Sequence, residues 1–252
     1  MRTVPPTNGP RFAAMPLTEG GTSIQEWLVA DRPPVIDMSE CARLVVVGAH
    51  PDDETLGLGA TSAQLAASGV AVRVVSVSDG GAAHPDASTA ERIRLQAVRR
   101  GELFDATSVL GVDRPFSLGL PDGQLSEHED RLVELLVEIL DGSAPGTWCA
   151  ATWRGDGHPD HEAVGRAAAA ACARTGVTLL EYPIWMWHWA IPGDPDVPWE
   201  RACTVPLADW SVACKSRAAH CFRSQFEPYG PTAVLPPFVL HRLMALGEMV
   251  FR

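Results

Sequence analysis

Two short segments of this chain bring histidine and carboxylate side chains close together. The first is Ala-His-Pro-Asp-Asp-Glu at residues 49–54, and the second is Gly-Asp-Gly-His-Pro-Asp-His at residues 155–161. A catalytic zinc ion takes three protein ligands of this kind and keeps a fourth position for water. His50 and Asp53, with a histidine from the second segment, meet that count. Asp52 is then left to take a proton from the water.

The residues around these segments alternate between strand-like and helix-like patterns. The β-branched run at 44–47 is typical of a strand buried on both faces of a parallel sheet. The other expected elements up to residue 182 are strands at 70–77, 115–118, 148–152 and 177–182 and helices at 55–68, 88–110, 126–140 and 160–174. Such alternation favours an α/β fold, a Rossmann-like three-layer sandwich with a mostly parallel sheet. Past residue 182 the signal is weaker and indicates helices at 207–221 and 238–246.

Ligands of such folds bind outside the carboxyl ends of the strands, and both segments directly follow an expected strand. Alternatively, Asp52, Asp53 and Asp160 are only acids in the first turns of helices, where the helix dipole favours them. The His-Pro-Asp at 84–86 serves as an internal control, since it has no second histidine nearby and we assign it no ligand. Two richer segments at corresponding strand ends favour the metal site.

These two segments resemble the motifs of the PIG-L or LmbE-like zinc-dependent N-acetylglucosaminyl deacetylases. The likeness extends from about residue 42 to about residue 225 and includes weaker features. These are Arg99-x-x-Glu102, Leu-Pro-Asp-Gly at 120–123, and Lys215 followed by Ser224-Gln225. The resemblance implies a metal-dependent hydrolase that acts on a linear amide C–N bond. Its substrate would be a small conjugate that contains N-acetylglucosamine, or another N-acylated glucosamine.

The metal ligands that the resemblance implies are His50, Asp53 and His161. The ion would be Zn²⁺, or another divalent metal such as Fe²⁺. Asp52 would be the general base that activates water. His158 would stabilise the oxyanion and protonate the leaving amine.

Four further residues receive supporting roles, of which that of Arg99 is implied by the resemblance. Arg99 and Asp122 would contact the substrate, and Glu54 and Asp160 would hold the metal ligands or their loops from behind. At Asp156 the chain departs from family members that act on glucosaminyl-inositol, which place a tyrosine there. That departure weakens the prediction of this particular substrate.

The composition fits a single acidic domain. Thirty-one acidic and 20 basic residues give a net charge of −11, which argues against a nucleic-acid partner, because binding a phosphate backbone needs clustered Lys and Arg. The length of 252 residues suits one domain, which we place at 41–252. Residues 1–40 are rich in proline and predict an irregular extension packed on that domain, with one short helix that Thr22 or Ser23 caps.

The six cysteines are scattered and form no CxxC pair, which favours a reducing compartment. No segment has the pattern of a signal peptide, and no apolar stretch reaches about 18 residues, so we expect a cytoplasmic protein without a membrane span. The sequence leaves open the aglycone, the acyl chain and a homo-oligomeric state.

Trp185, Trp187 and Trp189 alternate with other residues, so on an extended segment they would face one side. The favoured interpretation is that they pack in the core or in a subunit contact. The alternative is that they form an apolar platform for a sugar ring or an acyl chain.

Three alternative functions remain at this point. One is an amidase of the same scaffold that cleaves thiol–sugar conjugates. Another is a nucleotide-binding Rossmann-like protein without hydrolase activity, for which Gly57-x-Gly59 is the only glycine signal. The third is a metal-binding protein that has lost catalysis, against which Asp52 and His158 argue.

Overall fold

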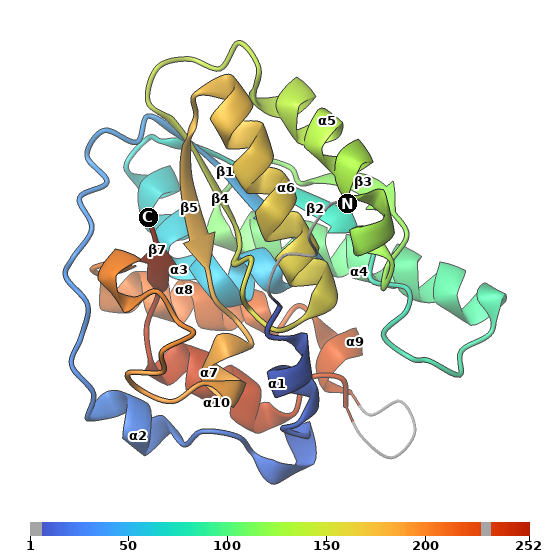
Figure 1. The fold of residues 1–252 in the computed structure, drawn as a ribbon. Coiled ribbons are helices and arrows are strands. Elements are labelled where there is room, and N and C mark those ends of the chain that lie inside the picture. Colours follow the sequence, from blue (N-terminus) through green and yellow to red (C-terminus); the bar gives the residue numbers. More distant parts are fainter. Residues whose placement is uncertain (1–6, 228–232) are drawn as a thin grey trace, which may run out of the picture.

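A seven-stranded sheet forms the centre of the computed structural model, which describes residues 7–227 and 233–252 (Figure 1). The strand order is β3-β2-β1-β4-β5-β7-β6. The parallel strands are β1 (Arg43–Gly48), β2 (Ala71–Ser78), β3 (Phe116–Leu120), β4 (Thr147–Thr152) and β5 (Thr178–Tyr182). The short strands β6 (Ala202–Thr204) and β7 (Met249–Phe251) complete one edge in antiparallel register. The expected α/β class with a mostly parallel sheet is therefore confirmed.

Helices cover both faces of the sheet (Figure 1). One face carries α5 (Glu129–Leu140) and α6 (Pro159–Thr175), and the other carries α3 (Asp53–Ala67), α4 (Thr89–Leu110) and α8 (Asp209–Ala219). The side chains of β1 alternate between the two cores, with Leu44 and Val46 in one and Val45 and Val47 in the other. Burial on both faces explains why the sequence reads as a continuous apolar run.

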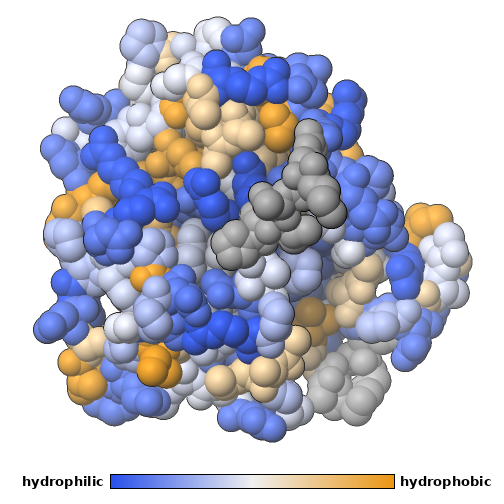
Figure 2. All heavy atoms as spheres, in the orientation of Figure 1, coloured by the Kyte–Doolittle hydropathy of each residue, from blue (hydrophilic) through white to orange (hydrophobic). Residues whose placement is uncertain are grey.

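The remaining described elements are short. The α-helices are α1 (Gly9–Ala13), α2 (Ile24–Leu28), α7 (Met186–Trp189), α9 (Arg223–Phe226) and α10 (Pro237–Ala245), and the 3₁₀ turns are η1 (Leu17–Glu19), η2 (Leu125–His128) and η3 (Trp199–Arg201). The helices expected at 207–221 and 238–246 are α8 and α10. No described helix has the length and apolarity needed to cross a membrane, and Figure 2 shows hydrophobic residues only as patches among hydrophilic ones on the face in view.

Helices α1 and α2 lie beside α7, and residues 29–40 then run along the outside of the sheet region to β1 (Figure 1). Ser23 caps α2 with Glu26 in a reciprocal capping box, as the sequence predicts. Further along, Ile36 donates its backbone N–H to the carbonyl of Thr204 on β6. Residues 1–6 of the expected extension lie outside the described residues.

Helix α3 follows the first histidine–carboxylate segment and is kinked at Leu58, where φ is −134° and ψ is 24°. The glycine before the kink is required by packing, since a Cβ on Gly57 would lie 2.2 Å from the ring of Tyr182. Tyr182 in turn donates its hydroxyl to the carbonyl of Val47 on β1. Gly57 therefore allows close packing of the helix on the sheet and is not part of a phosphate-binding turn. The nucleotide-binding alternative thereby loses the only sequence feature that supported it.

Candidate active site

The loops after β1 and β4 meet because these two strands are parallel neighbours in the sheet. Their meeting point brings His50, Asp53 and His161 together, with one ligand atom of each lying within 4.8 Å of the others. His50 is half-buried, and the other two are buried. The three residues that the sequence assigns to a metal thus form one cluster of two imidazoles and a carboxylate.

Carboxylates lie against both ring nitrogens of His50. Its Nε2 lies 3.0 Å from Asp122 Oδ1 and 3.2 Å from Asp160 Oδ2, while its Nδ1 faces Asp53 Oδ2 at 3.5 Å. Asp160 also accepts the backbone N–H of Gly123, and Asp122 accepts that of Ala82. These carboxylates keep the pKa of His50 well above its usual range, although burial opposes them. Asp160, to which the sequence assigns a supporting role, thus contacts His50 and also forms a second metal-capable group with His50 and His158. Asp122, which the sequence assigns to the substrate, contacts His50 as well.

His161 is held in the same way by a residue that sequence reasoning did not connect to it. Its Nδ1 lies 2.8 Å from Asp156 Oδ2, and its Nε2 lies 3.2 Å from Asp53 Oδ1. Burial lowers the pKa of His161, but Asp53 and Asp156 outweigh it and raise that pKa to about 9. The sequence feature that could have indicated this contact is the position of Asp156, between two glycines and five residues before His161.

Asp52 has the unusual backbone conformation of φ 131°. A non-glycine residue in such a region costs about 1–3 kcal/mol, which the surrounding structure must supply. Glu54 accepts the backbone N–H of Asp52 at 3.1 Å, and Arg99 Nη2 lies 3.2 Å from Asp52 Oδ2. Burial raises the pKa of Asp52 to about 7, against the lowering effect of Arg99. Asp52 is therefore a fixed, buried carboxyl whose pKa lies above its usual range. Burial likewise raises the pKa of Glu54 to about 7.

Arg99 is buried and braces the first loop. Its guanidinium donates to the carbonyls of Gly80, at 3.1 Å, and Pro51, at 2.6 Å, in addition to its contact with Asp52. Its Nε has no hydrogen-bond partner among the described residues. Arg99 also lines the site cavity, where the sequence places a substrate contact.

His158 lies beside the cluster, with its ring centroid 5.1 Å from that of His50 and 4.8 Å from that of His161. Its Nδ1 accepts the backbone N–H of Asp160 at 3.3 Å. The proton of the neutral ring therefore sits on Nε2. Burial and the positive charges of His161 and His50 lower the pKa of His158 to about 3, which favours that neutral ring.

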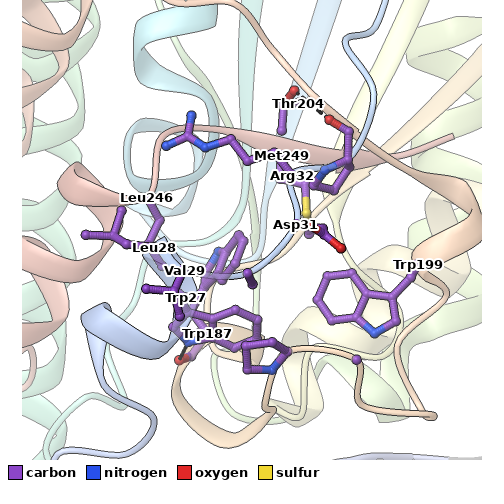
Figure 3. A pocket seen from close by; sticks show the side chains of 14 residues that line it. Trp27, Leu28, Val29, Asp31, Arg32, Trp187, Trp199, Thr204, Leu246 and Met249 are labelled. Atoms are coloured by element: carbon purple, nitrogen blue, oxygen red, sulfur yellow. Dashed lines mark hydrogen bonds between the residues drawn. The ribbon is translucent and has the colours of Figure 1, made fainter.

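These residues surround a cavity of about 250 Å³, whose apolar walls include Leu56, Ile184, Trp185 and Leu235. A second hollow of about 590 Å³ is lined by Trp27, Trp187 and Trp199 (Figure 3). Asp31 and Arg32 are the charged residues of its lining, which contains no histidine. The larger hollow therefore lacks groups for the chemistry of the smaller one.

The three alternating tryptophans form a helix and not an extended segment, so the expectation that they face one side is wrong. Trp185 reaches the site cavity, Trp187 lines the second hollow, and Trp189 donates its indole N–H to the carbonyl of Asp156. The cause is Asp156, whose carboxylate accepts the backbone N–H groups of Ile184, Trp185 and Met186 and so starts the turn. All three tryptophans are buried, as the packing interpretation predicts.

Known proteins are similar to this chain in sequence and in fold. The chain is 36% identical over 163 residues to a 1D-myo-inositol 2-acetamido-2-deoxy-alpha-D-glucopyranoside deacetylase of Mycobacterium sp. (strain KMS), covering 54% of this chain and 52% of the relative. The enzyme of the same name from Mycobacterium leprae (strain Br4923) is 30% identical over 227 residues, covering 79% and 70%. The chain thus spans about half the length of the first of these relatives.

An N,N'-diacetylchitobiose deacetylase from Pyrococcus horikoshii has a similar fold, with a TM-score of 0.57 and 22% identity over 76% of this chain and 75% of that one. The family model described as PIG-L: GlcNAc-PI de-N-acetylase matches residues 45–172, about half of the chain. The matched residues include both loops that converge on the metal-capable cluster. The chain therefore belongs to the PIG-L family.

Proposed function

We propose that the chain is a metal-dependent hydrolase that removes the acetyl group, or another acyl group, from the nitrogen of a glucosamine-containing conjugate. The observation that carries this proposal is the convergence of His50, Asp53 and His161 with Asp52 and His158 on one cavity. The names of the relatives support the substrate class, since they describe deacetylases of acetamido-sugar conjugates.

The residues present fit a divalent ion. Two imidazoles and one carboxylate are a ligand set that suits catalytic zinc and also ferrous iron, so we propose Zn²⁺ with Fe²⁺ as the alternative. The outer nitrogen of each histidine is held by a carboxylate, an arrangement that orients the ring toward a metal. When bound, the ion supplies Lewis acidity to a water molecule and to the amide carbonyl.

The neighbouring side chains then have distinct tasks. Asp52 takes a proton from the attacking water, a task that suits a buried carboxyl whose pKa burial raises. His158 donates the hydrogen bond of Nε2 to the oxygen on which negative charge develops. The leaving amine needs a proton that the neutral ring of His158, to which the sequence assigns this task, is poorly suited to give. As the C–N bond breaks, Asp52 therefore returns its proton to the amine nitrogen, so that the products are a carboxylic acid and a free amine. We propose Arg99 and Asp122, on the cavity wall, as the contacts of the sugar.

The test combines metal analysis with release of acetate. The purified chain is incubated with N-acetylglucosaminyl-inositol, N,N'-diacetylchitobiose and an acylated thiol–sugar conjugate, before and after treatment with a chelator. We expect about one divalent ion per chain, loss of acetate release in the chelator, and recovery on adding Zn²⁺ or Fe²⁺. The proposal is contradicted if the chain binds no metal, or if its rate of acetate release is the same with and without the chelator. Faster hydrolysis of the acylated thiol–sugar conjugate than of the other two substrates would favour the amidase alternative.

A further inference from the structure

The segment formed by residues 7–12, which includes most of α1, packs against the loop that carries the second histidine pair (Figure 1). It lies outside residues 45–172, which the family model matches. Thr7 donates its hydroxyl to Glu162 Oε2, and Asn8 donates its backbone N–H to Glu162 Oε1 at 2.9 Å. Glu162 is buried and also accepts the backbone N–H of Gly157. One carboxylate therefore joins the N-terminal segment to the loop.

Asn8 and Phe12 also contact the two glycines of the loop. Asn8 donates its side-chain amide to the carbonyl of Gly155 at 2.8 Å. A Cβ on Gly157, where φ is 91°, would lie 2.8 Å from Cβ of Phe12, so the loop backbone and Phe12 are in close contact. The ring of Phe12 lies 6.3 Å from that of His158 and 5.1 Å from that of Trp185. Phe12 thus touches both the loop and two walls of the cavity.

The segment is itself anchored away from the site. Arg11 forms ion pairs with Asp194 and Asp196 and lies over the ring of Trp189 at 4.5 Å. This matters because glycines at 155 and 157 leave the loop few side chains of its own to fix its backbone. A loop of that kind keeps one geometry only when neighbouring groups hold it.

We propose that residues 7–12 complete the active site, with Asn8 and Phe12 as positioning residues that hold the 155–158 loop and thereby aim His158 at the reacting oxygen. This inference rests on the proposed function, because it assigns the loop a reaction to serve. Neither residue is among those that line the cavity, so both act through His158 and its loop. Misplacing a catalytic group by about 1 Å can cost about 100-fold in rate.

The test uses Asn8→Ala and Phe12→Ala, with Ala13→Ser on the exposed side of the same helix as the matched control. Each metal-loaded protein is assayed well below its melting temperature, with kcat expressed per bound ion. We expect Phe12→Ala to lower kcat about 10- to 100-fold with less than about twofold change in KM. Asn8→Ala should lower kcat less, and Phe12→Tyr, which keeps the ring, should retain most of it.

Hydrogen exchange of the peptide covering residues 155–162 gives a readout that needs no substrate. We expect faster exchange there in Phe12→Ala and Asn8→Ala and no change in Ala13→Ser. Lower melting temperatures with unchanged kcat and unchanged exchange would overturn the proposal, because the segment would then only stabilise the fold. If the native chain hydrolyses none of the amides, the proposed function fails, and hydrogen exchange alone decides whether the segment positions the loop.

Discussion

Asp156 accepts a hydrogen bond from Nδ1 of His161 over 2.8 Å, and the same buried carboxylate starts helix α7. The bond fixes the tautomer and the orientation of the imidazole, so that Nε2 faces Asp53. Because Trp185 on this turn lines the cavity, one side chain sets both a candidate metal ligand and a wall of the site.

Replacing Asp156 by Asn should weaken metal binding about 10- to 100-fold, since this is the usual effect of losing a carboxylate behind a histidine ligand. The dissociation constant can be measured by competition with a chromogenic chelator. Asp141→Asn, on an exposed helix end, is the matched control. An unchanged metal affinity in Asp156→Asn would show that the bond to His161 does not tune the ligand.

The elements that carry the site were predictable because each leaves a local signal. The apolar run of β1 exists because its side chains face two cores in turn. The two loops could be placed at one edge because both follow parallel strands, whose carboxyl ends meet. Neighbouring β1 and β4 then bring His50 and His161 together without any long-range information beyond the strand pattern.

What could not be predicted depends on partners distant in the chain. The α7 turn exists because Asp156 caps it from 28 to 30 residues away, and a four-residue helix has too few residues to show a periodicity. The strands β6 and β7, of three residues each, are likewise too short to show an alternating pattern in the sequence. The contact of Phe12 with His158 links residues with no motif in common.

Asp52 and His161 should separate catalysis from metal binding. We expect Asp52→Ala to retain the ion and to lose about 100- to 10,000-fold in kcat, the usual contribution of a general base. His161→Ala should lose both the ion and the activity, because it removes one of the three proposed ligands. Metal analysis of each folded variant, checked by circular dichroism, decides the matter. Asp52→Ala without metal but with a native fold would make Asp52 a ligand.

Arg99 should set the acidic limb of the pH profile. A general base must be ionised, so kcat/KM should rise with pH as Asp52 loses its proton, at a pH that the charge of the bound ion lowers from the pKa of about 7 set mainly by burial. The charge of Arg99 lowers that pKa, so in Arg99→Gln the pKa rises and the limb moves to higher pH. The neighbouring Arg100→Gln, an exposed residue paired with Asp79, should leave the limb in place. A higher KM with an unmoved limb would instead mean that Arg99 serves only the sugar.

A buried ion pair between α8 and the residue before β7 lies against the kinked part of α3. Lys215 Nζ lies 2.9 Å from Glu248 Oε1, and both side chains are buried. Glu248 also accepts the backbone N–H groups of Ala60 and Thr61, in the first turn after the break at Leu58, where helical N–H groups need partners from outside the helix. Glu248 therefore acts as an N-cap for the second part of α3, supplied from a distant part of the chain.

Glu248→Ala should lower the free energy of unfolding by about 3–5 kcal/mol, because it leaves a buried ammonium without a partner. Urea unfolding measures the change, with the exposed Glu138→Ala as the control. Adding Lys215→Met to Glu248→Ala should recover part of the loss, since the unpaired charge is then removed. The backbone donors of α3 stay unsatisfied in that double variant, so recovery should be incomplete. A loss below about 1 kcal/mol in Glu248→Ala, the size of an exposed pair, would mean that water replaces the carboxylate and that the kink needs no cap.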